Sequence, residues 1–173
     1  MNRDTYGRRP PLHRLDDLSQ LIEPGLRALH AYWSAKRGAR PMPARADIDP
    51  IEVPRLLPHL MLVAVSDDPL RFRFRLVGTE IVARYGAELT GRELDEIDLG
   101  GELGGVRSQY EETVRAAAPT YCRHAIETRQ GKYLRYERLL LPLSSDGRQV
   151  DMLLGGVYLI PESAPLKPTG ARH

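Results

Sequence analysis

Side chains that could carry acid–base chemistry occur in this sequence as adjacent carboxylate pairs. The pairs are Asp67-Asp68 and Glu111-Glu112. General acid–base catalysis needs groups that reach the same substrate within hydrogen-bond distance. Neighbouring residues in a turn or on a helix point in different directions, and no serine lies in a nucleophile-elbow motif. The pattern therefore predicts a protein that is not an enzyme.

The histidines and the single cysteine are too scattered to indicate a metal or cofactor site. His59 and His124 lie near expected strands, where a heme ligand is conceivable, but a lone histidine there is more often hydrogen-bonded or exposed. His30 has no acidic or cysteine partner at metal-ligand spacing. Cys122 is the only cysteine, which excludes an intrachain disulfide and a multi-cysteine site. We expect no metal and no cofactor.

A glycine-rich segment and an arginine-bearing strand can each be interpreted in structural or in functional terms. Residues 100–105, GGELGG, fit neither GxGxxG nor a P-loop and follow an acidic segment that would repel phosphate. We interpret them as a flexible loop that could gate a pocket. Arg71, Arg73 and Arg75 alternate with apolar residues. This alternation predicts a solvated or ion-paired strand face, with an acidic partner or ligand as the alternative.

Length and composition are those of one globular domain. The chain has 173 residues, of which 42% are hydrophobic and 28% are charged. No apolar run approaches the ~20 residues of a membrane helix, and the N-terminus lacks the apolar core of a secretory signal. We therefore expect a cytoplasmic protein without a membrane partner. Residues 1–17 are predicted to be a flexible basic tail, residues 18–160 a single domain, and residues 161–173 a flexible C-terminal tail.

Hydrophobic periodicity predicts both helices and strands. Residues 18–36 repeat apolar side chains every three or four positions, which indicates an amphipathic helix that is interrupted or restarted near Pro24-Gly25. Period-two alternation and turn signals, including Asp146-Gly147, indicate five strands. The expected strands cover residues 59–66, 71–77, 120–128, 133–143 and 149–160.

Between the second and third strands, the sequence predicts a series of helices. Thr79 is expected to cap a short helix that ends at Gly86. A turn over residues 88–94 leads into another short helix, and a longer one covers residues 102–117. Another short helix is expected to begin at Asp49-Pro50, before the first strand. This order predicts an α+β fold with an antiparallel sheet.

The order of elements and several short motifs resemble the PAS domain family. The strand RFRFRLVG, a helix ending in Tyr-Gly and a Leu-Thr-Gly-Arg turn follow one another over residues 71–92. The leader, with YW, RG, P.PAR and DIDP between residues 32 and 50, is similar to that of a small stand-alone branch of PAS-like proteins. YER, LPL, DG and GGV over residues 136–157 extend the likeness, which covers roughly residues 18–160. It implies a five-stranded antiparallel sheet with short helices on one face and an N-terminal amphipathic helix.

The resemblance also implies where a ligand would bind. In a PAS-like arrangement a cavity lies between the sheet and the short helices, and an ordinary solid core is the alternative. The branch carries no general cofactor signature, and Cys122 lies on the third strand, away from the helical region that would hold a flavin-reactive cysteine. The side chains expected to line such a cavity are Phe74, Leu76, Ile81, Tyr85, Tyr110, Val114 and Tyr121.

The apolar stripe of the first helix needs a surface to cover. The first strand, HLMLVAVS, is apolar on both faces, so its second face also needs cover. Leu26, Leu29, Tyr32 and Trp33 are therefore expected to pack on the sheet or to form the seam of a homodimer.

These observations predict a sensory or interaction module in signal transduction. It would form a homodimer and act through a protein partner or a small apolar ligand. Two alternatives stay open: a small-molecule-binding enzyme on an α+β cavity fold, and a nucleic-acid-binding protein that uses arginine-rich tails. The body of the chain between the tails is slightly acidic, which disfavours nucleic acid. A salt titration of binding would discriminate, because phosphate contacts weaken steeply with salt.

Overall fold

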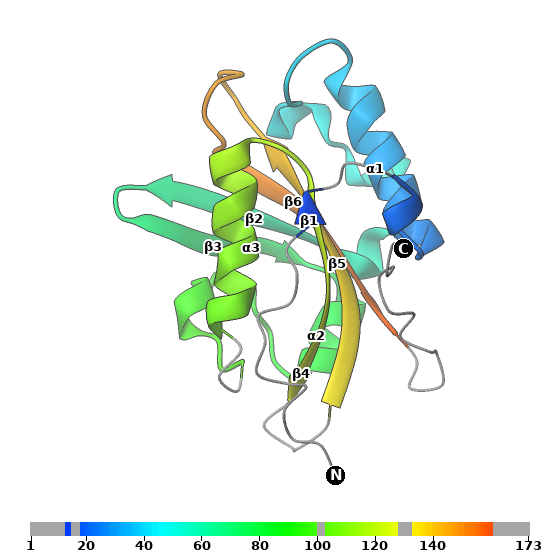
Figure 1. The fold of residues 1–173 in the computed structure, drawn as a ribbon, viewed down its shortest axis with the longest axis vertical. Helices are drawn as coiled ribbons and strands as arrows, with labels where there is room; N and C mark the ends of the chain where they lie inside the picture. The colour runs from blue at the N-terminus through cyan, green and yellow to red at the C-terminus, as the bar shows by residue number, and fades with distance from the viewer. Residues whose placement is uncertain (1–12, 15–17, 100–102, 128–132, 161–173) are drawn as a thin grey trace, which may run out of the picture.

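A computed structural model of the chain describes residues 13–14, 18–99, 103–127 and 133–160. Within these residues, six antiparallel strands form one sheet in the order β1-β4-β5-β6-β2-β3 (Figure 1). The strands are β1 (His13–Arg14), β2 (Leu60–Asp67), β3 (Leu70–Val77), β4 (Thr120–Glu127), β5 (Tyr133–Leu143) and β6 (Met152–Leu159). The helices are η2 (Leu18–Gln20), α1 (Pro24–Arg37), η3 (Arg45–Asp47), η4 (Pro50–Glu52), η5 (Leu57–His59), α2 (Thr79–Tyr85), η6 (Leu94–Glu96) and α3 (Leu103–Ala116).

The predicted α+β fold with its five-stranded antiparallel sheet is confirmed by β2 to β6. A sixth, two-residue strand was not predicted: His13 and Arg14 pair with Tyr121 and Thr120 at the edge of β4. These two residues lie within the tail expected over residues 1–17, and the flexibility of that tail stays a prediction. The rest of both expected tails, 1–12, 15–17 and 161–173, lies outside the described residues.

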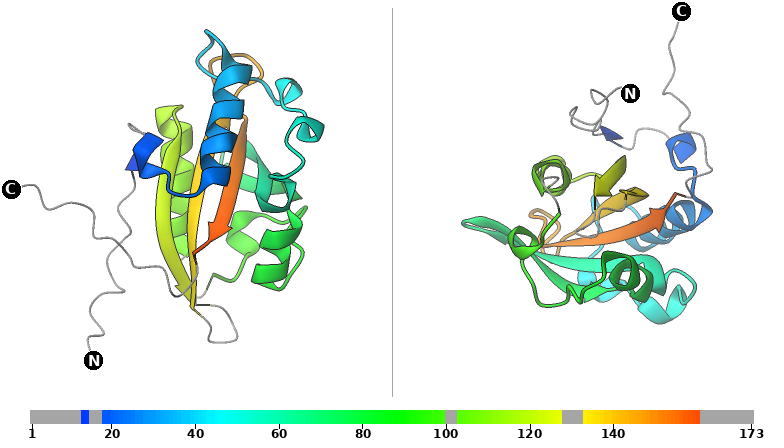
Figure 2. Two further views of the ribbon diagram at one scale, coloured as in Figure 1. Left: turned by 90° about the vertical axis from the view of Figure 1, so that its right-hand side faces the viewer. Right: turned by 90° about the horizontal axis from the view of Figure 1, so that it is seen from below.

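Helix α1 covers one face of the sheet, against β5 and β6 (Figure 2). It starts after Glu23, whose carboxylate accepts a hydrogen bond from the Gly25 amide, and it ends at Gly38, where φ is +57°. Leu26, Leu29 and Trp33 are almost fully buried. The restart expected near Pro24 is present, because residues 18–20 form a separate 3-10 turn.

The close approach of α1 depends on a glycine in β6. A Cβ atom built on Gly156 would lie 2.7 Å from Leu29 Cδ2 and 2.8 Å from Leu26 Cδ2. On the opposite face, a Cβ atom on Gly155 would lie 2.4 Å from Met61 Cε. Side chains from both faces therefore reach the backbone of β6 at these two residues.

Helices α2, η6 and α3 lie on the other face. Gly78, rather than the predicted Thr79, is the N-cap of α2. A Cβ atom on Gly78 would lie 2.3–2.4 Å from backbone atoms of Leu57 and Pro58, so only glycine lets α2 start this close to η5. Gly86 ends α2 with φ +81°, as expected.

Several boundaries differ from the sequence predictions. The helix expected from Asp49 to about Leu57 is a 3-10 turn over Pro50–Glu52 that Asp49 caps, followed by a separate turn, η5. Strand β6 begins at Met152 rather than at residue 149. The glycine-rich segment is partly helical, since α3 begins at Leu103. Residues 100–102 of that segment lie outside the described residues.

A β-bulge on β3 breaks its alternation. Phe74 pairs with Val63, but the next pair along β2 joins Leu62 to Leu76, so Arg75 is an extra residue in β3. An extra residue reverses the direction in which the following side chains point. Phe72 and Phe74 face the core beneath α3, whereas Leu76 faces the other side of the sheet, with Leu62.

Candidate ligand cavity

A cavity of about 280 Å³ lies between the sheet and the helices α2, η6 and α3. Small-molecule sites start at roughly 300 Å³, and a 150 Å³ apolar cavity is enough for benzene. Most of the wall is apolar, and exposed Glu80 and Arg84 of α2 stand at the rim. The lining side chains belong to His59, Met61, Phe74, Glu80, Ile81, Arg84, Tyr85, Leu89, Leu94, Ile97, Leu99, Val106, Tyr110, Tyr136, Arg138, Val157, Tyr158 and Leu159.

The structure brings four of the seven predicted residues together in this wall: Phe74, Ile81, Tyr85 and Tyr110. Tyr110 is 1% exposed, and its hydroxyl donates a 3.5 Å hydrogen bond to Met61 Sδ. Tyr85 donates a hydrogen bond to the Asp98 carbonyl. The tyrosines thus supply both apolar surface and polar tips to the wall.

The other three predicted residues lie outside the cavity wall. Leu76 faces the α1 side of the sheet because of the bulge at Arg75. Tyr121 faces that side too, and its hydroxyl accepts a 2.9 Å hydrogen bond from Arg123 Nε. Val114 packs against the core one turn beyond Tyr110, past the end of the cavity. Assigning these three to the wall was wrong because strand register and cavity length are set by tertiary structure.

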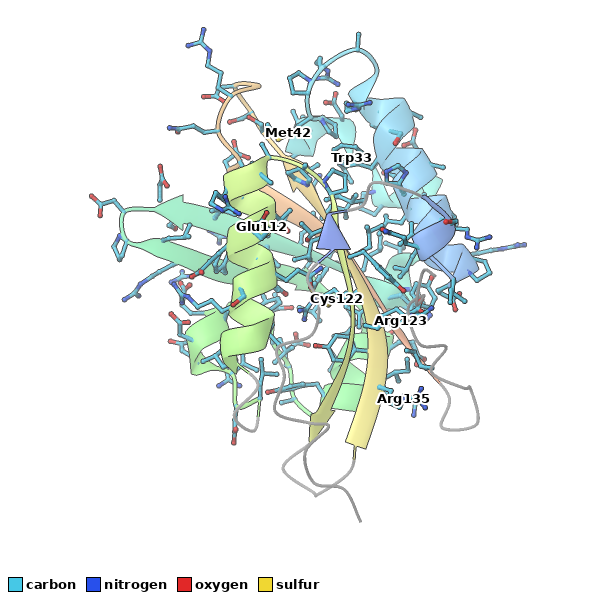
Figure 3. The ribbon with its side chains drawn as sticks, viewed as in Figure 1. Trp33, Met42, Glu112, Cys122, Arg123 and Arg135 are labelled. Carbon is cyan, nitrogen blue, oxygen red and sulfur yellow. The ribbon has the colours of Figure 1, made fainter. Side chains whose placement is uncertain are left out.

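The sheet-cover candidates lie where α1 meets the sheet. The Trp33 indole points from α1 toward the strands (Figure 3), and its Nε1 donates a 2.9 Å hydrogen bond to the Pro142 carbonyl. Tyr32 lies at the edge of this contact, where its hydroxyl donates a 2.8 Å hydrogen bond to Glu52. The apolar stripe of α1 is therefore occupied by the chain's own sheet.

Sequence reasoning missed the most polar feature of the wall, the buried Arg138 on β5. This arginine is 6% exposed. Its Nε donates a 2.7 Å hydrogen bond to Gln109 Oε1, and its guanidinium lies 5.3 Å from the ring centres of both Tyr110 and Tyr136. The sequence did carry a signal: Arg138 is two residues from both Tyr136 and Leu140, so all three share one face of a strand that is buried on both faces.

The groups around Arg138 do not neutralise its charge. Burial raises the pKa of Tyr110 to about 12 and also raises the pKa of Tyr136 and of the Cys122 thiol. All three are therefore uncharged near pH 7, while a guanidinium stays protonated. Among the described residues, no carboxylate forms a salt bridge with Arg138.

The energies show how the fold tolerates this charge. Removing a cation from water costs several kcal/mol. Each cation–π contact returns about 0.5–2 kcal/mol, and the hydrogen bond to Gln109 about 1.5–3 kcal/mol. These gains come close to the solvation cost, so Arg138 can be buried without a carboxylate. None of these contacts neutralises the guanidinium, so the wall of an otherwise apolar cavity carries a full positive charge.

The cavity wall also touches the start of α1. His59 stacks on Tyr158 with 3.9 Å between the ring centres, and both line the cavity. The Tyr158 hydroxyl lies 2.0 Å from the position that a Cβ atom would occupy on Gly25. Any Cβ atom at residue 25 would require the Tyr158 ring to move, so Tyr158 connects the cavity directly to the first turn of α1.

A second link between the sheet and α1 is a hydrogen bond to a buried, ion-paired carboxylate. Glu137 of β5 is 4% exposed and pairs with Arg123 of β4 at 2.7 Å. Its other oxygen accepts a 3.2 Å hydrogen bond from the Glu23 amide at the start of α1. Figure 3 labels Arg123 on its strand. Glu137 thus faces away from Arg138, its neighbour in the sequence.

The remaining chemical patterns do not converge on a site. Arg71, Arg73 and Arg75 are exposed, and Arg73 pairs with Glu93 at 2.7 Å. Glu111 pairs with Arg107 at 2.7 Å, while Glu112 pairs with Arg115. Within the described residues there is no cluster of three or more metal-binding side chains. No helix in that part of the chain is long and apolar enough to cross a membrane.

Comparison with known proteins identifies the family. The profile of the PAS domain matches residues 22–158, which is most of the chain. The five-stranded antiparallel sheet and its helices are thus those of the sensory α+β domain fold that this family shares. The chain belongs to the PAS domain family, which confirms the resemblance seen in the sequence. A comparison with curated proteins found no significant match.

Solved structures show the same fold at low sequence identity. A light-oxygen-voltage domain studied with a flavin analogue matches with a TM-score of 0.51 and 12% identity, over 65% of this chain and 84% of that one. The LOV protein of Rhodobacter sphaeroides matches with a TM-score of 0.50 and 13% identity, over 67% and 70%. The PAS domain of Bordetella pertussis BvgS has a TM-score of 0.48 and 17% identity, over 67% and 90%. At these identities the first two matches concern the fold alone.

Proposed function

We propose that this chain is a non-enzymatic sensory module that binds a small, mostly apolar molecule in its cavity and passes the binding event to a protein partner. The observation that carries the proposal is the cavity of about 280 Å³, with its mostly apolar wall. PAS domains are generally sensory modules, and a solid core would leave no such space. We propose a cytoplasmic setting, as expected from a sequence without a membrane-length apolar run.

Transmission through α1 is supported by the contact between Tyr158 and Gly25. A ligand that moves the Tyr158 ring displaces the first turn of α1, because no free space separates them. We also propose that the module works as a homodimer. Since Leu26, Leu29 and Trp33 are buried within the chain, the dimer seam has to use other side chains, such as Ile51, which is 82% exposed.

Binding can be tested with two neutral probes, 1-octanol and 4-phenyl-1-butanol. A ligand that binds only the folded state raises its stability by about 2.7 kcal/mol at 100 times its Kd. We expect either probe to raise the melting temperature of the wild type. Val106→Phe should fill the cavity and abolish this rise, whereas Val114→Phe, on the same helix but outside the cavity, should retain it. Equal responses of the two variants would contradict binding in the cavity.

Transmission can be tested by hydrogen exchange with and without 1-octanol. We expect bound probe to change amide exchange in residues 24–37. In Tyr158→Leu the probe should still bind, but the change in α1 should disappear. An α1 response that survives in this variant would refute the route through Tyr158.

A further inference from the structure

The charge of Arg138 gives the cavity a chemical preference beyond apolarity. A guanidinium has five N–H donors. The described residues supply Gln109 at 2.7 Å, the Tyr136 hydroxyl at 3.4 Å and the Cys122 sulfur at 3.8 Å, and the last two are long contacts. Arg138 therefore retains donor capacity, as well as its charge, on the side of the cavity that it lines.

We propose that the cavity takes a small amphipathic carboxylate, with its charged head on Arg138 and its apolar body against Leu94, Ile97 and Val106. This inference rests on the proposed function, that the cavity binds a small molecule. A carboxylate matches the planar fork of a guanidinium with two parallel hydrogen bonds. It also brings one negative charge to a wall that holds one buried positive charge.

The balance of charge favours a carboxylate over a phosphate monoester. A phosphate monoester carries close to two negative charges near pH 7, and Arg138 is the only buried cation among the described lining residues. The other arginine of the wall, Arg84, is exposed at the rim, where Glu80 has the opposite charge. The head of the ligand thus lies at the buried end of the cavity, and its apolar body extends toward α2.

Two matched pairs of probes test the proposal on the wild-type protein: octanoate with 1-octanol, and 4-phenylbutanoate with 4-phenyl-1-butanol. Each pair differs only in its head group. Calorimetric titration near pH 7 should give a Kd for the carboxylate that is about 10- to 100-fold lower than for the alcohol, the factor expected of a hydrogen bond to a charged group. Alcohols that bind as tightly as the carboxylates would overturn the inference and leave the proposed function standing. If neither member of either pair binds, both are overturned.

Variants locate the preference within the cavity. Arg138→Gln should abolish the preference for carboxylates, and Arg138→Lys, which keeps the charge without the fork, should retain only part of it. Arg84→Gln is the matched control and should keep the wild-type preference. If Arg84→Gln loses the preference for carboxylates and the Arg138 variants keep it, the carboxylate head lies at the rim of the cavity and Arg138 does not bind it. The comparison of carboxylate with alcohol uses the wild-type protein, so it tests the proposed preference for carboxylates even if Arg138→Gln does not fold.

Discussion

The substitution Gly156→Ala tests whether α1 is held against the sheet by close contact. The added Cβ atom would lie 2.7 Å from Leu29 Cδ2 and 2.8 Å from Leu26 Cδ2, whereas ordinary contacts begin at 3.4 Å. The leucine side chains or the whole of α1 must therefore retreat by about 0.6–0.7 Å. Both leucines are at most 1% exposed, so there is no adjacent solvent into which they can turn.

The expected cost follows from this crowding. Adding a methyl group to a tightly packed core typically costs about 1–3 kcal/mol. For a domain of this size, each kcal/mol lowers the melting temperature by about 2–4 °C. We therefore expect Gly156→Ala to melt about 2–12 °C below the wild type in a thermal unfolding experiment, with a matching loss of free energy of unfolding in urea.

Gly104→Ala is the matched control. Gly104 is exposed in the first turn of α3, and a Cβ atom there meets nothing within 4 Å. Alanine is favoured over glycine in a helix by up to about 1 kcal/mol, so this variant should be as stable as the wild type or slightly more so. If Gly156→Ala is as stable as Gly104→Ala, then α1 does not pack as the structure describes.

Three further predictions concern the core, the cavity and cofactors. Trp33→Ala should lower the free energy of unfolding by about 3–5 kcal/mol, because a buried ring and its hydrogen bond to Pro142 are lost; native-like stability in urea would contradict this. Tyr110→Trp should place its larger ring in the cavity and abolish binding of 1-octanol while the melting temperature stays near that of the wild type. A marked fall in melting temperature, with no probe binding to the wild type, would show that Tyr110 is simply part of a solid core. Purified protein should show neither flavin nor heme absorbance. The Cys122 thiol, which is hydrogen-bonded to Gln109, lies outside the cavity wall and cannot form a flavin adduct there, and the ring of His59 in the wall is already stacked on Tyr158 and lies 3.3 Å from the Val157 carbonyl. A stoichiometric chromophore would refute that prediction.

Periodicity in the sequence was sufficient to predict the sheet and the main helices. The alternation of Phe72 and Phe74 placed both on the buried face of β3, and the three- and four-residue spacing of Leu26, Leu29 and Trp33 predicted a buried stripe on α1. These patterns are reliable because each element repeats its own geometry.

The cavity wall depends on features that no local pattern encodes. The bulge at Arg75 moves Leu76 to the other face, and a bulge leaves little trace in the residue types around it. Arg138 is part of the YER motif that supported the family resemblance, but a charged side chain is seldom fully buried, so its type gives no sign of its position in the cavity wall. Its burial depends on Gln109, Tyr110 and Tyr136, which only the folded chain brings together.

The adjacent glycines of β6 make the sheet unusually thin beside the cavity. Gly155 and Gly156 leave only backbone between Met61, which lines the cavity, and Leu29, which belongs to α1. Elsewhere in a sheet, two layers of side chains would absorb a small displacement before it crossed from one face to the other. Under the proposed function, a ligand that pushes on Met61 would act on Leu29 of α1 through the backbone of β6 alone, without an intervening layer of side chains.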